Sequence, residues 1–147
     1  MQTLSKSERL GNFRLQKMLF SQGNSFFCHP FRVVYLVLKP DELSADTFGL
    51  FQYPVKTIFP VPARNIRKAT ARNRVRRLMK ESFRKNKSGL YSFLNNRHEI
   101  CLLALVYSIR QILPYREMES KIRLSLQRLE EAIQNNGGKS GDPANGQ

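Results

Sequence analysis

One segment, residues 61–87, constrains the fold of this 147-residue chain more than any other. Apolar side chains recur in its second half at intervals suited to one helix face: Val75, Leu78, Met79 and Phe83. At about 100° per residue they form a single stripe, and most of the basic residues project from the opposite side. We therefore predict a helix over residues 69–87 that packs on a core by one face and presents cations on the other.

The charge of this segment indicates a polyanionic partner. It holds eleven Lys and Arg residues but one acid, Glu81, and so supplies +10 of the chain's formal net charge of +14. Four cations follow one another at i,i+4 spacing with no acid on that line: Arg72, Arg76, Lys80 and Arg84. Like charges at this spacing repel by roughly 0.2–0.5 kcal/mol per pair, whereas ordinary solvated faces mix their signs. This pattern favours a nucleic acid as the partner.

The rest of the composition indicates one domain. Hydrophobic residues make up 41% of the chain, which is enough to form a core. We assign residues 1–134 to this domain and residues 135–147, which have almost no apolar side chains, to a disordered tail. The chain lacks an apolar run of 18 residues and has a polar N-terminus, so we expect no membrane span, no export and a cytoplasmic location. Cys28 and Cys101 are expected to be buried and unpaired.

Periodicity and turn signals predict the other elements. A short helix over residues 12–22 ends at Gly23, and strands are expected at residues 32–39, 47–52, 53–59 and 99–108. A last helix follows Pro114, with one apolar stripe formed by Met118, Ile122, Leu126, Leu129 and Ile133. The first three strands are expected to form antiparallel hairpins. The order α-β-β-β-α-β-α then predicts a mixed α/β sheet with helices on at least one face.

No group of residues has the spacing of a catalytic or metal site. His29 and His98 form no recurrent pair with other ligands, and most of the acids fall in an expected loop. Glycine-rich phosphate-binding motifs and serine-centred motifs are absent from the sequence. We therefore expect no catalytic residue and no metal ligand in the polypeptide. Aromatic residues around the first helix and strand are expected mainly in the core, with one or two exposed to stack on bases: Phe20, Phe26, Phe27, Phe31 and Tyr35.

Residues 72–74 open the basic helix with the tripeptide Arg-Asn-Arg, and further segments accompany it along the chain. These segments are Glu8-Arg9-Leu10, Leu19-Phe20 followed by Gly23, Phe31-Arg32-Val33-Val34-Tyr35, and Ile112-Leu113-Pro114-Tyr115. An Arg-Asn-Arg tripeptide alone is common in arginine-rich helices, so the ordered set, which spans residues 7–133, is the specific signal. In this order the chain resembles the protein subunit of bacterial ribonuclease P, whose helix begins with an RNR motif.

The resemblance implies a fold and a function. The fold is an α/β (α+β) sandwich like ribosomal protein S5 domain 2, with a left-handed βαβ crossover that departs from the usual rule. The implied function is to bind the ribonuclease P catalytic RNA, as a monomer in a 1:1 complex, and the single-stranded 5′ leader of precursor tRNA. The protein is then an accessory subunit of an endoribonuclease, with no DNA or membrane partner. The RNA performs the cleavage and holds the Mg²⁺ ions.

The resemblance also assigns roles to individual residues. The RNA-binding set is Arg67, Lys68, Arg72, Asn73, Arg74, Arg76, Arg77, Lys80 and Arg84. Phe20 and Tyr35 match aromatic positions that line a leader-binding cleft in the family. That cleft would be flanked by Arg64, Arg77 and Lys80. Three positions depart from the family's usual residues: Ala63 and Asn65, which replace basic residues, and Gln16, which replaces an aromatic residue.

Other classes of protein could carry the same basic helix. One is a ribosomal or general RNA-binding protein of this fold that has no part in cleavage. A second is a protein-only nuclease, which would cut RNA without an RNA subunit. Binding of double-stranded DNA is a weaker alternative, because the sequence contains no evident recognition-helix pair or dimer seam.

Overall fold

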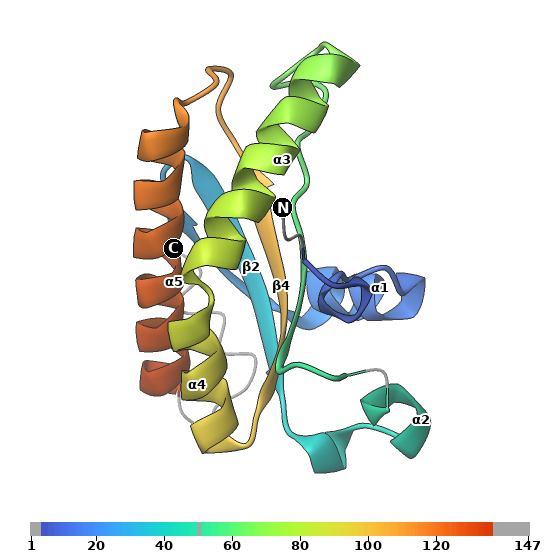
Figure 1. Ribbon diagram of the computed structural model, residues 1–147. Coiled ribbons are helices and arrows are strands. Elements are labelled where there is room, and N and C mark those ends of the chain that lie inside the picture. Colours follow the sequence, from blue (N-terminus) through green and yellow to red (C-terminus); the bar gives the residue numbers. More distant parts are fainter. Residues whose placement is uncertain (1–3, 50, 137–147) are drawn as a thin grey trace.

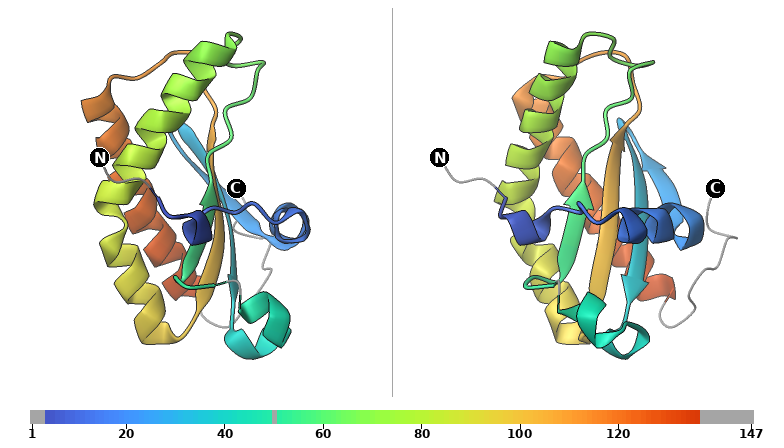
Figure 2. Two further views of the ribbon diagram at one scale, coloured as in Figure 1. Left: turned by 45° about the vertical axis from the view of Figure 1, so that its right-hand side comes forward. Right: turned by 90° about the vertical axis from the view of Figure 1, so that its right-hand side faces the viewer.

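The computed structural model describes residues 4–49 and 51–136. In chain order its elements are η1 (Lys6–Glu8), α1 (Phe13–Gln22), β1 (Asn24–Cys28), β2 (Phe31–Leu38), η2 (Pro40–Glu42), α2 (Ala45–Phe48), β3 (Val55–Ile58), α3 (Ala69–Asn86), α4 (Ser88–Arg97), β4 (Ile100–Tyr107) and α5 (Tyr115–Asn136). The strands form one central sheet (Figure 1). Figure 2 shows α3, α4 and α5 on one side of this sheet and α1 on the other.

The sheet is mixed, with the strand order β1-β2-β4-β3. Strand β2 pairs antiparallel with both β1 and β4, whereas β3 runs parallel to β4. Because β3 and β4 are adjacent, parallel and joined through α3 and α4, they form the βαβ crossover that the resemblance implies. The predicted α+β class is confirmed.

The two faces of the sheet are apolar but are covered differently. On β2, Val33 and Tyr35 point into a core shared with α3, α4 and α5, and we name this side the closed face. Val34 and Leu36 point the other way and pack with Leu10, Leu15 and Leu19, the last two of which lie on α1; we name this side the open face. Successive side chains alternate between the faces. This double burial explains why β4, and β2 from Val33 onward, are continuously apolar in sequence.

Residues 47–59 differ from the prediction of two strands in antiparallel hairpins. The first part forms the short helix α2, because Ser44 Oγ caps its start by accepting a hydrogen bond from the backbone N–H of Thr47 at 3.2 Å. Among the described residues of this region only β3 is a strand, and it lies between Pro54 and Pro60, which lack the N–H donor that a ladder needs. Its partner is the distant β4, so the predicted hairpin arrangement of this region is wrong.

One strand and one α-helix are additional to the predicted order, besides the short 3-10 helices η1 and η2. Strand β1 forms a hairpin with β2 through a turn that contains a cis peptide bond between His29 and Pro30. Helix α4 follows α3 directly and buries Leu90 and Leu94 in the core of the closed face. It ends at Arg97 and is capped by His98, which adopts the left-handed conformation with φ 55°. Tertiary burial therefore stabilises a helix whose sequence contains a glycine and two asparagines.

Some remaining predictions concern the chain as a whole. Helix α5 extends to Asn136 and so crosses the boundary predicted at residue 134, while the rest of the predicted tail lies outside the described residues. Cys28 and Cys101 are buried free thiols, as predicted. Burial raises the pKa of Cys101 to about 12. Among the helices within residues 4–49 and 51–136, none combines the length and apolarity needed to cross a bilayer.

Residues 5–9, which we name the N-terminal segment, are fixed to the helices by one buried acid. Glu8 is 2% exposed and accepts hydrogen bonds from Tyr91 Oη at 2.6 Å and from the backbone N–H of Ser5 at 2.9 Å. It also forms an ion pair with Lys87, at the junction of α3 and α4. Burial alone would raise the pKa of Glu8, but the hydrogen bonds and the cation outweigh burial, so its pKa lies below the usual value.

Candidate nucleic-acid interface

Helix α3 is held by one face, as its sequence predicts. Val75, Met79 and Phe83 are fully buried, and the ring of Phe83 meets that of Phe59 edge to face at 5.7 Å between centroids. Burial of these side chains fixes the rotation of the helix about its axis. The basic residues are consequently directed toward solvent or along the two flanks of the helix.

The three residues of the RNR motif have different surroundings. Arg72 turns back toward the preceding loop, where Nη1 donates hydrogen bonds to the carbonyl oxygens of Ile66 at 3.0 Å and Arg67 at 2.7 Å. Asn73 is exposed, and its Oδ1 accepts a hydrogen bond from Nη1 of Arg76 at 2.8 Å. Arg74 is exposed and makes no hydrogen bond or ion pair with any residue in the part of the chain that the structure describes. Of the three, Arg74 is the cation most available to an external ligand.

The other predicted RNA-binding residues surround this motif. Arg67 and Lys68 are exposed in the loop before α3, and Arg77 is exposed on the helix. They extend the cationic surface from the loop into the third turn of α3. No charged side chain of opposite sign is hydrogen-bonded to them within the described residues.

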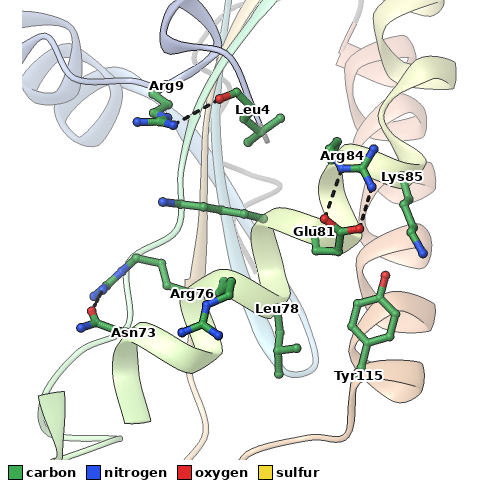
Figure 3. Close-up of a pocket in the computed structure, with 11 residues that line it drawn as sticks. Leu4, Arg9, Asn73, Arg76, Leu78, Glu81, Arg84, Lys85 and Tyr115 are labelled. Atoms are coloured by element: carbon green, nitrogen blue, oxygen red, sulfur yellow. Dashed lines mark hydrogen bonds and ion pairs between the residues drawn. The ribbon is translucent and has the colours of Figure 1, made fainter. Parts of the chain in front are cut away.

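Arg84 differs from the other cations because it is neutralised within the helix. Its Nη2 and Nε donate to the two carboxylate oxygens of Glu81, at 2.6 Å and 3.2 Å. The hydrogen bond from Arg84 lowers the pKa of Glu81, and the same bond raises the pKa of Arg84. Figure 3 shows this pair on one side of α3 with Tyr115, whereas Asn73, Arg76 and Arg9 lie on the other side. Arg84 therefore offers less free charge than the sequence suggests.

Phe20 and Tyr35 were predicted to line one cleft, but they lie on opposite faces of the sheet. Phe20 lies on α1 above the open face and is 49% exposed. Tyr35 points into the closed face, is 4% exposed, and packs edge to face against Phe26 with ring centroids 6.1 Å apart. The sheet itself separates the two rings, so Tyr35 belongs to the core. Arg64 is exposed in the loop before α3.

The open face also exposes Arg32, which was not a predicted site residue, and Phe27, which was named only as one of five aromatic residues of which one or two would be exposed. Arg32 is exposed on β2 and shares a face with Val34, because residues two apart in a strand point the same way. Its cross-strand partner on β1 is Phe27, which is 57% exposed. Because side chains alternate between the two faces along a strand, the sequence of β2 could have placed Arg32 and Tyr35 on opposite faces of the sheet.

Within residues 4–49 and 51–136, no group of three or more His, Cys, Asp or Glu side chains is placed to hold a metal ion. Acids next to the basic helix are already engaged: Glu81 by Arg84, Glu8 by Lys87 and Tyr91, and Glu119 by Asn86 and Arg123. The donor set therefore does not fit a protein-held metal at this surface. What the surface provides is a set of cations and exposed aromatic rings, a combination suited to phosphates and unpaired bases.

Comparisons with known proteins agree with this description. The sequence model of the family described as Ribonuclease P matches residues 4–130. Two curated relatives, each the ribonuclease P protein component of a strain of Porphyromonas gingivalis, are 29% and 30% identical over 126 residues, which is 86% of this chain and 85% of theirs. The solved ribonuclease P protein of Staphylococcus aureus has a TM-score of 0.60 at 14% identity, covering 84% of this chain and 96% of that one.

Proposed function

Because this chain belongs to the ribonuclease P protein family, we propose that it binds the catalytic RNA and the 5′ leader of precursor tRNA and so assists removal of that leader. A ribonuclease P protein component works within an endoribonuclease complex whose other partner is the ribonuclease P RNA. The proposal adds the single-stranded leader as a second ligand. It also assigns the cleavage chemistry and the Mg²⁺ ions to the RNA, and it includes a 1:1 complex in the cytoplasm.

The exposed cations of α3 and of the loop before it support the RNA-binding part of the proposal. Arg67, Lys68, Arg74 and Arg77 are all exposed, and none is paired with an acid in the described residues. Each phosphate that a cation neutralises releases condensed counterions from the RNA. We expect the affinity for the catalytic RNA to fall about 10³- to 10⁵-fold between 50 and 200 mM salt if roughly 6–10 phosphates are contacted.

The open face supports the leader-binding part. Phe20 on α1 and Phe27 on β1 are exposed aromatic side chains, and Arg32 lies on the same face as Phe27. Rings of this kind can stack on unpaired bases, while the guanidinium can meet the phosphates between them. We therefore assign the leader to the open face, with Phe20 retained from the prediction and Tyr35 excluded by its burial in the opposite core.

Reconstitution with the cognate catalytic RNA tests the proposal. The rate of leader removal from precursor tRNA is measured at low Mg²⁺ with RNA alone, with wild-type protein, and with an Arg74→Ala variant. Wild-type protein is expected to accelerate cleavage. The Arg74→Ala variant is expected to require a higher protein concentration to reach the same cleavage rate, because the substitution removes an exposed, unpaired cation. Arg128→Ala, which removes an exposed arginine of α5, serves as the matched control.

Each alternative class predicts a different result. A general RNA-binding protein of this fold would leave the cleavage rate of the catalytic RNA unchanged. A protein-only nuclease would cut the precursor without any RNA subunit. If the Arg74→Ala variant assembles with the catalytic RNA as wild type does, Arg74 does not belong to the interface.

A further inference from the structure

The flank of α3 that faces the N-terminal segment gathers three cations from two distant parts of the chain. Arg9 follows η1, while Arg76 and Lys80 lie one turn apart on α3. All three line one surface hollow of about 670 Å³, together with Asn73 and Arg77. Figure 3 shows Arg9 and Arg76 on the same side of the helix. We propose that Arg9, Arg76 and Lys80 form a single binding site for a phosphate group of the RNA backbone.

The backbone holds Arg9 at this position. Arg9 forms an isolated parallel bridge with Thr57 of β3, and the N–H of Leu10 donates to the Thr57 carbonyl oxygen at 3.0 Å. On its other side, Glu8 is fixed by Lys87 and Tyr91. The position of Arg9 is thus determined by the sheet edge and by the α3–α4 junction. A preorganised cation loses less entropy on binding than one carried by a free terminus.

The two guanidinium groups keep donors for a ligand. Arg9 donates from Nη2 to the carbonyl oxygen of Leu4 at 3.3 Å. Arg76 donates from Nε to the carbonyl oxygen of Phe59 at 3.3 Å and from Nη1 to Asn73. A guanidinium has five N–H donors, so these contacts orient both groups and leave further donors unused. Oriented guanidinium groups suit the oxygens of a phosphate.

Lys80 supplies the third charge. It is half-buried and makes no hydrogen bond or ion pair with any residue in the described ranges. Burial, followed by the nearby charges of Arg9 and Arg76, lowers its pKa. A cation placed beside two others, with its ammonium donors unpaired, is stabilised by an incoming anion.

Among the described residues, no acid that lines this hollow is free to neutralise the three cations. Glu81 lines it but is paired with Arg84 at 2.6 Å. Glu8, the sequence neighbour of Arg9, is buried against Lys87 and Tyr91. The site therefore carries an excess of positive charge that an external phosphate would compensate. Because the inference takes RNA as the source of that phosphate, it rests on the proposed function.

Binding of the catalytic RNA is measured for wild type, Arg9→Gln, Lys80→Gln and the double variant over a range of salt concentrations. Arg9→Gln is expected to weaken binding about tenfold and to reduce the slope of log affinity against log salt by up to about 0.9. If the two cations share one phosphate, the double variant loses less than the product of the two single losses. Arg128→Gln, the matched charge change on α5, is expected to bind as wild type.

A second arm uses inorganic phosphate without RNA, at constant ionic strength. Phosphate is expected to raise the melting temperature of the wild type more than that of Arg9→Gln, and the melts without phosphate verify that the variant is folded. Equal RNA binding by wild type and Arg9→Gln overturns the site but leaves the proposed function intact. If the wild-type protein does not bind the RNA, the proposed function is wrong and RNA is not the ligand of this site. The experiment with inorganic phosphate then decides whether an anion site is present.

Discussion

The two faces of the sheet are built from the same apolar strands, yet helices cover the closed face more completely than the open face. Three helices cover the closed face, and Val33 and Tyr35 of β2 lie in its core. On the open face α1 covers the centre, while Arg32 and Phe27 remain exposed beside it. The difference shows that apolar content determines where strands form, whereas the covering helices determine which side chains can meet a ligand.

The strongest test of this contrast compares one aromatic residue from each face. Tyr35→Ala is expected to lower the free energy of unfolding by about 3–5 kcal/mol, because it removes a buried ring from the closed core. Phe20→Ala is expected to cost less than about 1 kcal/mol, since its ring is half exposed. Urea denaturation of both variants measures the difference. Similar losses for the two would contradict the assignment of Tyr35 to the core and Phe20 to the surface.

A second prediction concerns the acid that fixes the N-terminal segment beside α3 and α4. Glu8→Gln is expected to lower the free energy of unfolding by about 2 kcal/mol at neutral pH, because charge-assisted hydrogen bonds are lost. The pKa of Glu8 is depressed in the folded state, so its stabilisation is present above its ordinary pKa near 4.5 and is lost as pH falls through the folded pKa. Thermal melts from pH 7 to pH 3 should therefore show less acid sensitivity in Glu8→Gln than in wild type. Equal acid sensitivity would mean that other carboxylates determine it.

The third prediction concerns the ligand of the open face. Phe20→Ala and Phe27→Ala are each expected to weaken binding of precursor tRNA by about 1 kcal/mol, roughly fivefold, with little effect on mature tRNA. Binding of the two tRNAs to the reconstituted complex measures this selectivity. Phe48→Ala, which truncates an exposed phenylalanine of α2, is the matched control. If binding of both tRNAs weakens equally, the leader does not bind to the open face.

The smallest expected effect comes from the ion pair on α3. Glu81→Gln frees Arg84, whose Nη2 lies 2.6 Å from the carboxylate, and removes the single acid of residues 61–87. We expect a steeper salt dependence of RNA binding, by up to about 0.9 in the slope if Arg84 then neutralises one phosphate. Titration of the RNA at several salt concentrations measures it. An unchanged slope would place Arg84 outside the interface.

The sequence predicted the elements whose periodicity is strong. Helices α1, α3 and α5 and strands β2 and β4 all lie close to their predicted positions. Strand β1 and helix α4 were missed because their signals are weak locally, and burial of Leu90 and Leu94 by the rest of the fold stabilises α4. The parallel partner of β3 was also missed, since pairing between β3 and β4 depends on contacts across more than forty residues.

The site was predicted less completely than the fold. The basic residues of α3 were identified, but the sequence did not show that Arg72 is bound to loop carbonyl oxygens or that Arg84 is paired with Glu81. Arg9 is separated from Lys80 by 71 positions in the sequence, so its contribution to the same hollow follows only from the fold. Contacts of this kind depend on tertiary geometry and leave no local pattern.

The hydrogen bond from Tyr91 to Glu8 determines when the N-terminal segment can dock during synthesis on the ribosome. Glu8 and Arg9 are translated before the residues that fix Glu8, Lys87 and Tyr91, which follow about eighty residues later. Docking of the segment therefore waits until α3 and α4 have been made. A nascent chain consequently cannot complete its cationic surface until α3 and α4 have left the exit tunnel.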